Sequence, residues 1–384
     1  MSTLDYSTTP LMEFGAYSIK KAGSLCVEKL AAKNLLIVTD PGVGKAGLLA
    51  PLEKSLIATG LTFEIFDNIS SDPLEMEVLE GALKAQKHSC DGIIGIGGGS
   101  PMDAAKAIAI LVKSKTPIQD LYGLGRVTEG RVPLMLIPTT AGTGSEATNY
   151  AVITTPMGEK ISITDPASFP DIALLDPTLT VGLPQHLTAA TGMDALVHAI
   201  EAFTSKGNKS EFSDRDAIKA LKLLWKSVPK ATKNGEDQTA RTDALMGAYL
   251  AGQAIANAPV GGVHALAYPL GGLHHIHHGL SNALLLPPVL RFNAPAAAPL
   301  YAELGEAVMP NLTGSVEARS ETFIKALEDM ILECGLETRL SKIGLTESHI
   351  PELATEAMKL ERLLVNNPRE ISQLDCTKIY ESIL

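Results

Sequence analysis

The first half of the chain alternates short apolar runs with amphipathic segments, and this pattern constrains the possible folds more than any other sequence feature. Buried strands of a parallel sheet have this length and continuous apolar character, and crossover helices separate them. We therefore predict an α/β domain with a parallel sheet, whose strands cover the runs Leu35 to Thr39, Phe63 to Phe66, Gly92 to Ile96, Leu134 to Ile137 and Ile172 to Leu175.

Two of the helices between these runs have recognisable start signals. Asp72 is followed by Pro73, and Ser100 is followed by Pro101. A capping side chain before a proline at the first helical position favours a helix start. The sequence thus predicts helices that begin at these two prolines.

Beyond Pro184 the pattern changes to long stretches with helical periodicity, such as His186 to Thr204 and Asp214 to Trp225. A chain of 384 residues, of which 45% are apolar and 20% charged, is long enough for two domains with sizeable cores. We predict an α/β domain over residues 1–182 and an all-helical domain over residues 183–384.

Charge and cysteine content exclude several classes of protein. The chain has 32 Lys and Arg against 43 Asp and Glu, a formal charge of −11, and no basic stripe, so nucleic acid is not an expected partner. No signal peptide is recognised at the start. The apolar stretch from Ala283 to Leu300 is interrupted by three prolines and an arginine, so no membrane span is expected. The four cysteines are far apart, which favours free thiols in a reducing, cytoplasmic location.

A glycine-rich segment, DGIIGIGGGSPMD from Asp91 to Asp103, leads from a predicted strand into a predicted helix. Gly97, Gly98 and Gly99 allow close approach of a ligand, and the helix start favours an anion such as a pyrophosphate. The alternative is a tight turn with no ligand. A second loop of small residues, Ile137 to Asn149, follows the next predicted strand and is expected at the same sheet edge.

Asp40, at the end of another predicted strand, indicates which dinucleotide is preferred. A carboxylate there can accept a hydrogen bond from a ribose 2′-hydroxyl and repel a 2′-phosphate, which favours NAD over NADP. The alternative is a turn formed with Pro41 and Gly42. In an orthodox Rossmann domain the glycine loop comes before the acidic residue, whereas here Asp40 comes first. The sequence therefore predicts a variant of that fold.

A metal site is indicated in the second half. Asp194 and His198 are four residues apart on a predicted helix and so project from one face. His264 lies in a second helical run, which we expect to break at Pro269, Gly271 and Gly272. Four further histidines follow, and a chain that turns back can bring one of them beside His264: His274, His275, His277 or His278. One carboxylate with three imidazoles suits zinc or iron, and the alternative is an exposed histidine-rich loop.

The residues above resemble the iron-containing (group III) alcohol dehydrogenase family, related in fold to glycerol dehydrogenase and dehydroquinate synthase. The resemblance spans nearly the whole chain and rests on GGGSPMD at 97–103, PTTAGTGSEATN at 138–149, ATGMDALVHAIEA at 190–202, HALAYPLGG and HHGLSNALLLP within 264–287, and NNPRE at 366–370. It implies a dehydroquinate synthase-like fold, in which an NAD-binding α/β domain precedes an all-helical metal domain and the active site lies in the cleft between them.

The resemblance also implies the roles of individual residues. It implies one divalent metal, Fe²⁺ first and Zn²⁺ as the alternative, held by Asp194, His198, His264 and His278. For the nucleotide it indicates Asp40, Gly98, Gly99, Ser100, Asp103, Thr139, Thr140, Thr143, Asn149, Lys160 and Leu179, to which the glycine turn itself adds Gly97. It further implies a homodimer or larger homo-oligomer.

Tyr268 departs from the family pattern. Many members carry a second histidine at this position, four residues after His264, which is thought to relay a proton. A phenol, with an ordinary pKa of about 10, is a poor base near neutrality. Tyr268 is therefore a candidate either for a catalytic role or for a wall of the substrate pocket, and His274, His275 or His277 is a candidate for the relay.

The function expected from these features is reversible hydride transfer between an alcohol and its aldehyde or ketone, with a nicotinamide cofactor and a metal. Three alternatives were weighed. A maleylacetate reductase-like enzyme would lack the full ligand set. A dehydroquinate synthase-like lyase would need basic residues beside the metal, which the segments 190–202 and 260–286 lack. A non-catalytic nucleotide- or metal-binding scaffold would reduce no cofactor.

Overall fold

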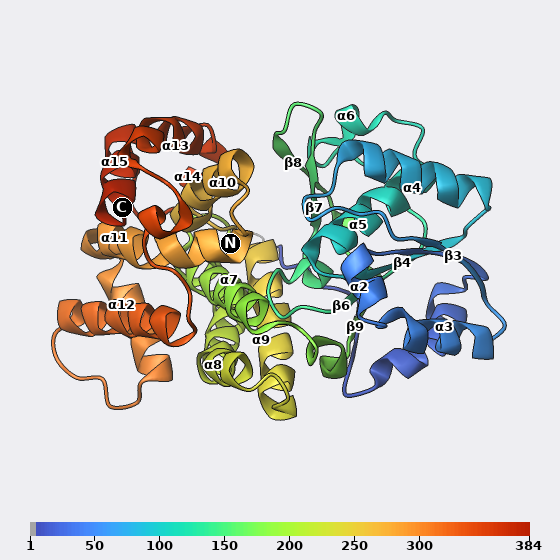
Figure 1. Ribbon diagram of the computed structural model, residues 1–384, viewed down its shortest axis with the longest axis horizontal. Helices are drawn as coiled ribbons and strands as arrows, with labels where there is room; N and C mark the ends of the chain where they lie inside the picture. Colours follow the sequence, from blue (N-terminus) through green and yellow to red (C-terminus); the bar gives the residue numbers. More distant parts are fainter. Residues whose placement is uncertain (1–4) are drawn as a thin grey trace. The chain divides into compact units, whose positions relative to one another are not determined.

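The computed structural model describes residues 5–384, which form two compact units (Figure 1). One unit consists of Thr8–Gly182 and contains all the strands. The other consists of Leu183–Leu384 joined by residues 5–7, and in this part its regular elements are helices. The predicted fold class, a parallel α/β half and a helical half, is confirmed.

The first unit is built on a six-stranded sheet in which all neighbouring strands are parallel. Its order is β1-β9-β6-β4-β2-β3. The strands are β1 (Leu11–Phe14), β2 (Asn34–Val38), β3 (Thr62–Phe66), β4 (Gly92–Gly97), β6 (Leu134–Pro138) and β9 (Ile172–Leu175). Five of them cover the predicted apolar runs. The edge strand β1 was not predicted, because only alternate residues of this short segment are half-buried.

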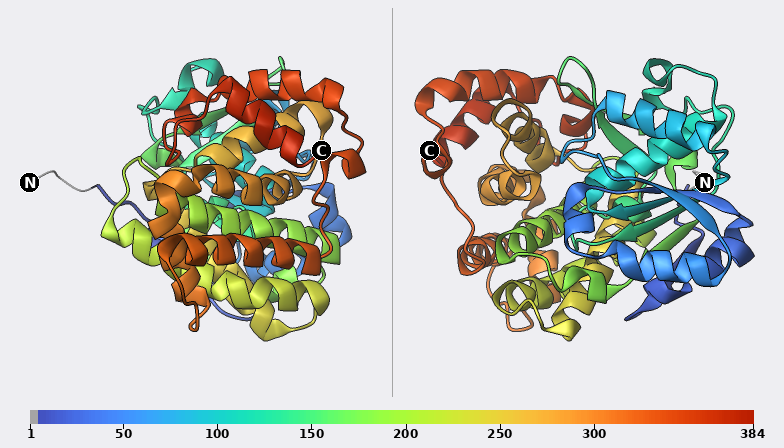
Figure 2. Two further views of the ribbon diagram at one scale, coloured as in Figure 1. Left: turned by 90° about the vertical axis from the view of Figure 1, so that its left-hand side faces the viewer. Right: turned by 45° about the vertical axis from the view of Figure 1, so that its right-hand side comes forward.

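Successive residues of the central strands pack into two different cores, as the twofold period of a strand requires. Leu36 and Val38 of β2 belong to one core, and Leu35 and Ile37 belong to the other. Figure 1 shows helices α4 and α5 on one side of the sheet and α3 on the other, and the right view of Figure 2 shows the same layers. The helices of this unit are α1 (Ala22–Leu25), α2 (Pro41–Lys45), α3 (Leu49–Ala58), α4 (Glu75–Lys87), α5 (Gly99–Lys113) and α6 (Ile118–Leu121).

Both predicted helix starts in this unit were wrong by one or two residues. Helix α4 begins at Glu75, where the carboxylate of Glu77 accepts a hydrogen bond from the Leu74 amide at 2.9 Å. Helix α5 begins at Gly99 with Gly98 as its N-cap, so Ser100 and Pro101 lie inside its first turn. Helix α4 thus starts two residues after Pro73, whereas α5 starts two residues before Pro101, which the first turn of a helix tolerates.

A small second sheet, also not predicted, extends the first unit. It contains β5 (Gly123–Leu124), β7 (Tyr150–Thr154) and β8 (Lys160–Thr164), in the order β5-β8-β7, and the β7–β8 pair is antiparallel. Prolines and glycines lie close to both β7 and β8 in the sequence, so each strand has only a short stretch of alternating apolar residues. This short pattern did not predict a strand.

The second unit is organised around helix α7 (Gln185–Thr204), which is buried from Thr188 to Thr204 and packs against α8, α9 and α11. The left view of Figure 2 looks onto this unit. None of the helices within residues 5–384 combines the length and apolar character that a bilayer span requires. The remaining helices are α8 (Glu211–Lys233), α9 (Gln238–Asn257), α10 (Gly262–His274), α11 (His278–Val308), α12 (Val316–Glu333), α13 (Ile350–Met358), α14 (Glu361–Leu364) and α15 (Gln373–Ser382).

Candidate functional site

Helix α7 presents Asp194, His198 and Glu201 along one buried face. Their spacing of four and then three residues is the spacing of side chains stacked on one side of an α-helix. The predicted pairing of Asp194 with His198 on one helix face is therefore observed, and the next residue on that face is a third ionisable group.

Helices α10 and α11 bring the other imidazoles to α7. His264 lies in the first turn of α10, and His278 is the first residue of α11. The predicted break at Pro269 was wrong, because α10 continues through Pro269 to His274. Buried Leu266 and Leu270 hold this stretch in the core, and tertiary packing of this kind outweighs local propensity. The chain reverses at His275, whose φ is +55°.

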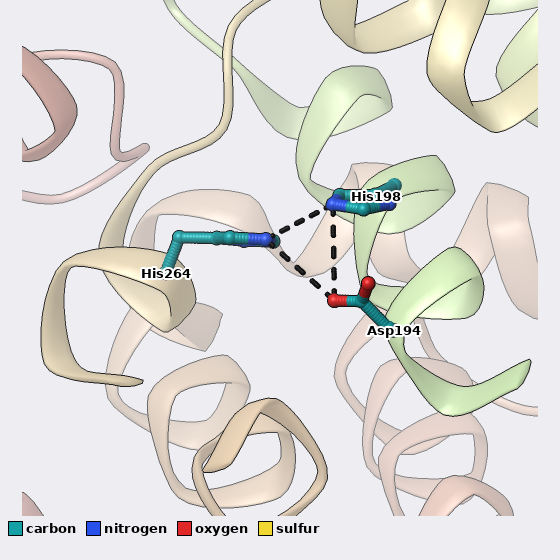
Figure 3. Close-up of side chains that lie close together, drawn as sticks. All are labelled: Asp194, His198 and His264. Carbon is teal, nitrogen blue, oxygen red and sulfur yellow. Dashed lines mark hydrogen bonds and ion pairs between the residues drawn. The ribbon is translucent and has the colours of Figure 1, made fainter. Parts of the chain in front are cut away.

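The side-chain oxygen or nitrogen atoms of Asp194, His198 and His264 converge (Figure 3). Asp194 Oδ1 lies 3.8 Å from His198 Nε2, 3.9 Å from His264 Nε2 and 3.5 Å from His278 Nε2. The Nε2 atoms of His198 and His264 are 3.1 Å apart. Two ligands that each lie about 2.1 Å from one tetrahedral cation are about 3.4 Å apart. The observed distances scatter around this value, so Asp194, His198 and His264 can hold a single divalent ion, and His278 lies within reach of the same Asp194 oxygen.

The surroundings of Asp194 keep its carboxyl group ionised, as binding of a cation requires. Burial raises the pKa of the Asp194 carboxyl, but His198, His278 and His264 act against it together with a hydrogen bond from Asn282, and the net result lowers this pKa to about 2. The carboxylate is thus negatively charged at any physiological pH, although it is almost completely enclosed. A buried charge of this kind is costly unless a cation or donors compensate it.

Two polar residues of this cluster were missed by the sequence analysis. The Glu201 carboxylate pairs with His264 Nδ1 at 2.5 Å. The Asn282 amide donates to Asp194 Oδ1 at 2.6 Å, and its own buried carbonyl oxygen has no hydrogen-bond partner among residues 5–384. Helical spacing could have found both, because Glu201 lies seven residues after Asp194 and Asn282 lies four residues after His278.

The remaining histidines of the loop do not join the cluster. The His274 ring packs edge-on against His349, with 5.1 Å between ring centroids. His275 and His277 occupy the reversal between α10 and α11. Tyr268, one turn after His264, lies 6.2 Å from the His264 ring and 5.6 Å from the His278 ring. The side chain of His278 is 36% exposed, whereas those of Asp194 and His264 are buried, so Tyr268 stands on the accessible side of the cluster.

A substitution at Gly279 should separate His278 from Asp194. A Cβ atom at this position would lie 2.1 Å from the backbone oxygen of Ala190, so α11 can cross α7 here only through a glycine. We expect Gly279→Ala to lower the free energy of unfolding by about 1–3 kcal/mol through overpacking, and to weaken metal binding. Chemical denaturation and metal titration measure both effects. The matched control is Gly272→Ala in α10, where a Cβ meets nothing within 4 Å; equal effects of the two substitutions would contradict the prediction.

In the first unit, the strand order explains why Asp40 precedes the glycines. If β1 is left out, the strands β2, β3, β4, β6 and β9 can be numbered 1 to 5 along the chain. With these numbers, their order across the sheet is 2-1-3-4-5. Sheets of this order bind ligands where the order reverses, between the first and third strands of that numbering. Here these strands are β2 and β4. Asp40 follows β2, and the glycine turn follows β4.

Most of the predicted nucleotide residues gather at this edge of the sheet. Gly97, at φ +147°, leaves no room for a side chain, because a Cβ would lie 2.4 Å from Pro101. A Cβ on Gly99 would be 2.9 Å from Thr143. The Thr139 amide donates to Gly97 O at 2.9 Å, and the buried Thr140 hydroxyl has no hydrogen-bond partner within the described chain. Close packing, first-turn amides of α5 and a spare hydroxyl fit a phosphate-containing ligand.

Asp40 itself is the N-cap of α2, as the alternative prediction of a turn former required. Its Oδ1 accepts hydrogen bonds from the amides of Gly42 at 2.7 Å and Val43 at 3.1 Å. Its Oδ2 lies 3.1 Å from the point where a side chain on Gly97 would begin. One oxygen therefore supports the helix while the other borders the glycine turn.

The other nucleotide candidates have different surroundings. Lys160 Nζ pairs with Asp72 at 2.6 Å, and the Ser100 hydroxyl donates to Ser71 O. The Asn149 carbonyl accepts a hydrogen bond from the Asp165 amide. Leu179 is packed in one of the two cores of the sheet. Asn149, Lys160 and Leu179 therefore lie outside the glycine turn, and the Ser100 side chain, which is next to the turn, already has a hydrogen-bond partner.

The Asp103 carboxylate belongs to a buried cluster of charges. It accepts hydrogen bonds from Ser145 Oγ at 2.6 Å and the Val152 amide at 3.0 Å. Lys106, with no exposed surface, lies 3.4 Å from it and donates to Thr148 Oγ1 and Tyr150 O at 2.9 and 2.7 Å. Burial lowers the pKa of Lys106 and raises that of nearby Glu146 to about 7. The cluster ties α5, which begins at the glycine turn, to the loop before β7.

Comparison with known proteins identifies relatives of both units. The family model for iron-containing alcohol dehydrogenase matches residues 10–177, and the model for the C-terminal part of the Fe-containing alcohol dehydrogenase family matches residues 188–384. A long-chain-alcohol dehydrogenase of Geobacillus thermodenitrificans is 39% identical to this chain. The alignment covers 93% of this chain and 91% of that protein. The NAD-dependent methanol dehydrogenase of Bacillus methanolicus is 36% identical over 98% of both chains. The crystal structure of a 1,3-propanediol oxidoreductase superimposes with a TM-score of 0.96 at 33% identity over the full length of both chains.

Proposed function

The chain belongs to the iron-containing alcohol dehydrogenase family, and we propose that it transfers a hydride reversibly between an alcohol and NAD with the help of one divalent metal ion. The observation that carries this proposal is the convergence of Asp194, His198 and His264, with His278 Nε2 3.5 Å from Asp194 Oδ1. The glycine turn that follows β4, next to the end of β2, supports the nucleotide part of the proposal.

We assign the four converging side chains as the metal ligands. A divalent cation held by them would act as a Lewis acid that polarises the oxygen of the alcohol or carbonyl substrate. Asp194 supplies the negative charge, and the three imidazoles supply neutral nitrogen ligands. The same donor set suits Fe²⁺ and Zn²⁺. We propose Fe²⁺ from the family and Zn²⁺ as the alternative.

The α/β unit would hold the dinucleotide through the glycine turn. The first-turn amides of α5 would bind a pyrophosphate, and Gly97, Gly98 and Gly99 would keep the approach to them free of side chains. Thr139, Thr140 and Thr143 line the neighbouring loop. Asp103 would support this site indirectly, because its hydrogen bonds hold Ser145 and Val152 in place. We keep Ser100, Asn149, Lys160 and Leu179 as proposed contacts of the more distant parts of the cofactor.

Tyr268 is proposed as a wall of the alcohol pocket. It faces His264 and His278 on the accessible side of the ligand cluster. A ring in this place limits the width of the substrate near the metal.

The direct test of the function is NAD reduction with a panel of primary alcohols and diols, followed by the absorbance of the reduced nicotinamide. We expect turnover that depends on added Fe²⁺ or Zn²⁺ after anaerobic purification and chelation. A protein that binds the metal and the nucleotide but reduces no NAD with any alcohol, and oxidises no reduced cofactor with any aldehyde, would refute the proposal.

Cofactor preference gives a specific prediction for Asp40. We expect kcat/KM to be higher with NAD than with NADP, because the Asp40 carboxylate would repel a 2′-phosphate. Asp40→Asn removes the charge but keeps a good N-cap for α2. We expect this change to reduce the preference for NAD by about tenfold, equivalent to about 1.4 kcal/mol. Asp67→Asn, which alters an exposed acidic residue after β3, serves as the control. An unchanged preference in Asp40→Asn would contradict this role.

We also propose that the protein is cytoplasmic and forms a homo-oligomer. All four cysteines are free thiols and buried, as in proteins of a reducing compartment. The edge strand β1 exposes part of Met12 and Phe14, and an open sheet edge with apolar side chains favours association. Light scattering of the purified protein tests the second statement.

A further inference from the structure

A buried carboxylate on α7 reaches the start of the helix that carries His264. Glu201 is only 4% exposed, and both of its oxygens are used at this helix start. One oxygen pairs with His264 Nδ1 at 2.5 Å, and the other accepts a hydrogen bond from the Val263 amide at 2.7 Å.

We propose that Glu201 is a positioning residue that prepares His264 for metal binding. A carboxylate partner at Nδ1 places the ring proton on that nitrogen, so the lone pair of Nε2 remains free to face a cation. In this structure Nε2 of His264 points toward Nε2 of His198 and Oδ1 of Asp194. The proposal rests on the proposed function, because the cation is the one assigned to that site.

The same carboxylate also fixes the backbone that carries the ring. Val263 lies in the first turn of α10, where amides lack partners within the helix. A negative charge at this end is favourable to the helix dipole. Glu201 therefore holds both the ring of His264 and the backbone next to it, which sets the position and the rotation of the imidazole together.

Asn366 and Asn367, the first two residues of the NNPRE motif at 366–370, also form hydrogen bonds at the start of α10. Asn367 Oδ1 accepts a hydrogen bond from the Gly262 amide at 3.2 Å, and the Asn366 side chain donates to Val260 O at 3.1 Å. Both contacts are with backbone atoms. Glu201 is the group at this helix start that contacts the backbone and the imidazole at once.

The test is a titration of the chelator-treated full-length protein with Co²⁺, whose visible absorption reports both occupancy and ligand geometry. The variant is Glu201→Gln, which keeps the shape of the side chain. Its amide NH₂ would face either the Val263 N–H or the Nδ1–H of His264, so one of the two contacts is lost. Loss of such a supporting partner weakens metal binding by about 10–100-fold. We expect this loss together with a changed Co²⁺ spectrum.

Tyr380→Phe is the matched control. The buried Tyr380 hydroxyl donates to Leu266 O at 2.6 Å, so this change also removes one buried hydrogen bond to α10, two residues beyond His264, without touching a ligand. We expect Tyr380→Phe to bind Co²⁺ with the affinity and spectrum of the wild type. Glu201→Asp, with a shorter carboxylate, is the second variant and should bind Co²⁺ less tightly than Tyr380→Phe even if Glu201→Gln does not fold.

Two results would overturn the inference while leaving the proposed function intact. One is wild-type Co²⁺ affinity in Glu201→Gln or, where that variant does not fold, in Glu201→Asp. The other is an equal loss in Tyr380→Phe, which would reveal a general effect of loosening α10. A wild-type protein that binds no Co²⁺ would instead overturn the proposed function, and this inference with it.

Discussion

Asp194→Ala is expected to abolish metal retention and turnover together. The side chain is the one carboxylate among the four converging groups, and its Oδ1 lies within 4 Å of three imidazole nitrogens. Lewis-acid assistance contributes several kcal/mol to the stabilisation of a transition state, so we expect the rate of NAD reduction to fall by at least about a thousandfold, since each 1.36 kcal/mol is worth tenfold. Metal analysis by mass spectrometry and a single-turnover assay measure the two effects.

The control for this variant is Asp329→Ala, which removes an exposed carboxylate from the same helical unit. Asp329 pairs only with Lys325 on the surface of α12, and we expect unchanged metal content and turnover. Asp194→Ala protein that has lost its metal but still oxidises alcohol at the wild-type rate would refute the assigned mechanism. Retention of one metal per chain in the variant would refute the assigned ligand set.

Lys106→Ala is expected to destabilise the α/β unit more than any other single substitution considered. Removal of one partner from a buried charge pair costs about 3–5 kcal/mol, because the Asp103 carboxylate stays enclosed without its cation. At about 2–4 °C for each kcal/mol in a domain of this size, the melting temperature of this unit should fall by about 6–20 °C. Differential scanning calorimetry measures the change.

Two comparisons separate the charge effect from the loss of packing. Lys106→Met fills most of the volume but also leaves Asp103 without its cation, so we expect it to lose nearly as much stability as Lys106→Ala. Lys113→Ala changes an exposed lysine near the end of the same helix, and its effect should stay within about 0.5 kcal/mol. Wild-type stability in Lys106→Met would show that the buried ammonium is not needed.

The sequence predicted those parts of the fold that depend on local pattern. Continuous apolar runs identified β2, β4, β6 and β9, because a strand buried on both faces needs no polar residues. The edge strand β3 was identified from its short, largely apolar run although most of its residues are only partly buried. The edge strand β1 and the small sheet were not predicted from the sequence, because their stability comes from pairing with other strands and not from a local pattern. Pro269 was read as a helix breaker, whereas the packing of Leu266 and Leu270 keeps α10 intact.

The site was predicted to a similar extent. Helical spacing alone linked Asp194 to His198, but it gave no choice among the four histidines after Pro269, and the choice of His278 came from family resemblance. Glu201 was overlooked because its partner, His264, is 63 residues away in the chain. Asp40 was predicted either as a ribose ligand or as a turn former. The structure shows it as the N-cap of α2, and the strand order explains why it also borders the glycine turn.

Residues 5–7 belong to the helical unit, although the α/β unit follows them in the chain. The Ser7 backbone exchanges hydrogen bonds with Asn257 at 2.8 and 2.9 Å, and the Tyr6 hydroxyl bonds to Asp216. During synthesis on the ribosome, residues 8–182 are complete before these partners emerge. Residues 5–7 must therefore wait, undocked, until α8 and α9 have been made, and a bulky fusion placed ahead of Tyr6 would delay a late step of maturation while sparing the early folding of the sheet.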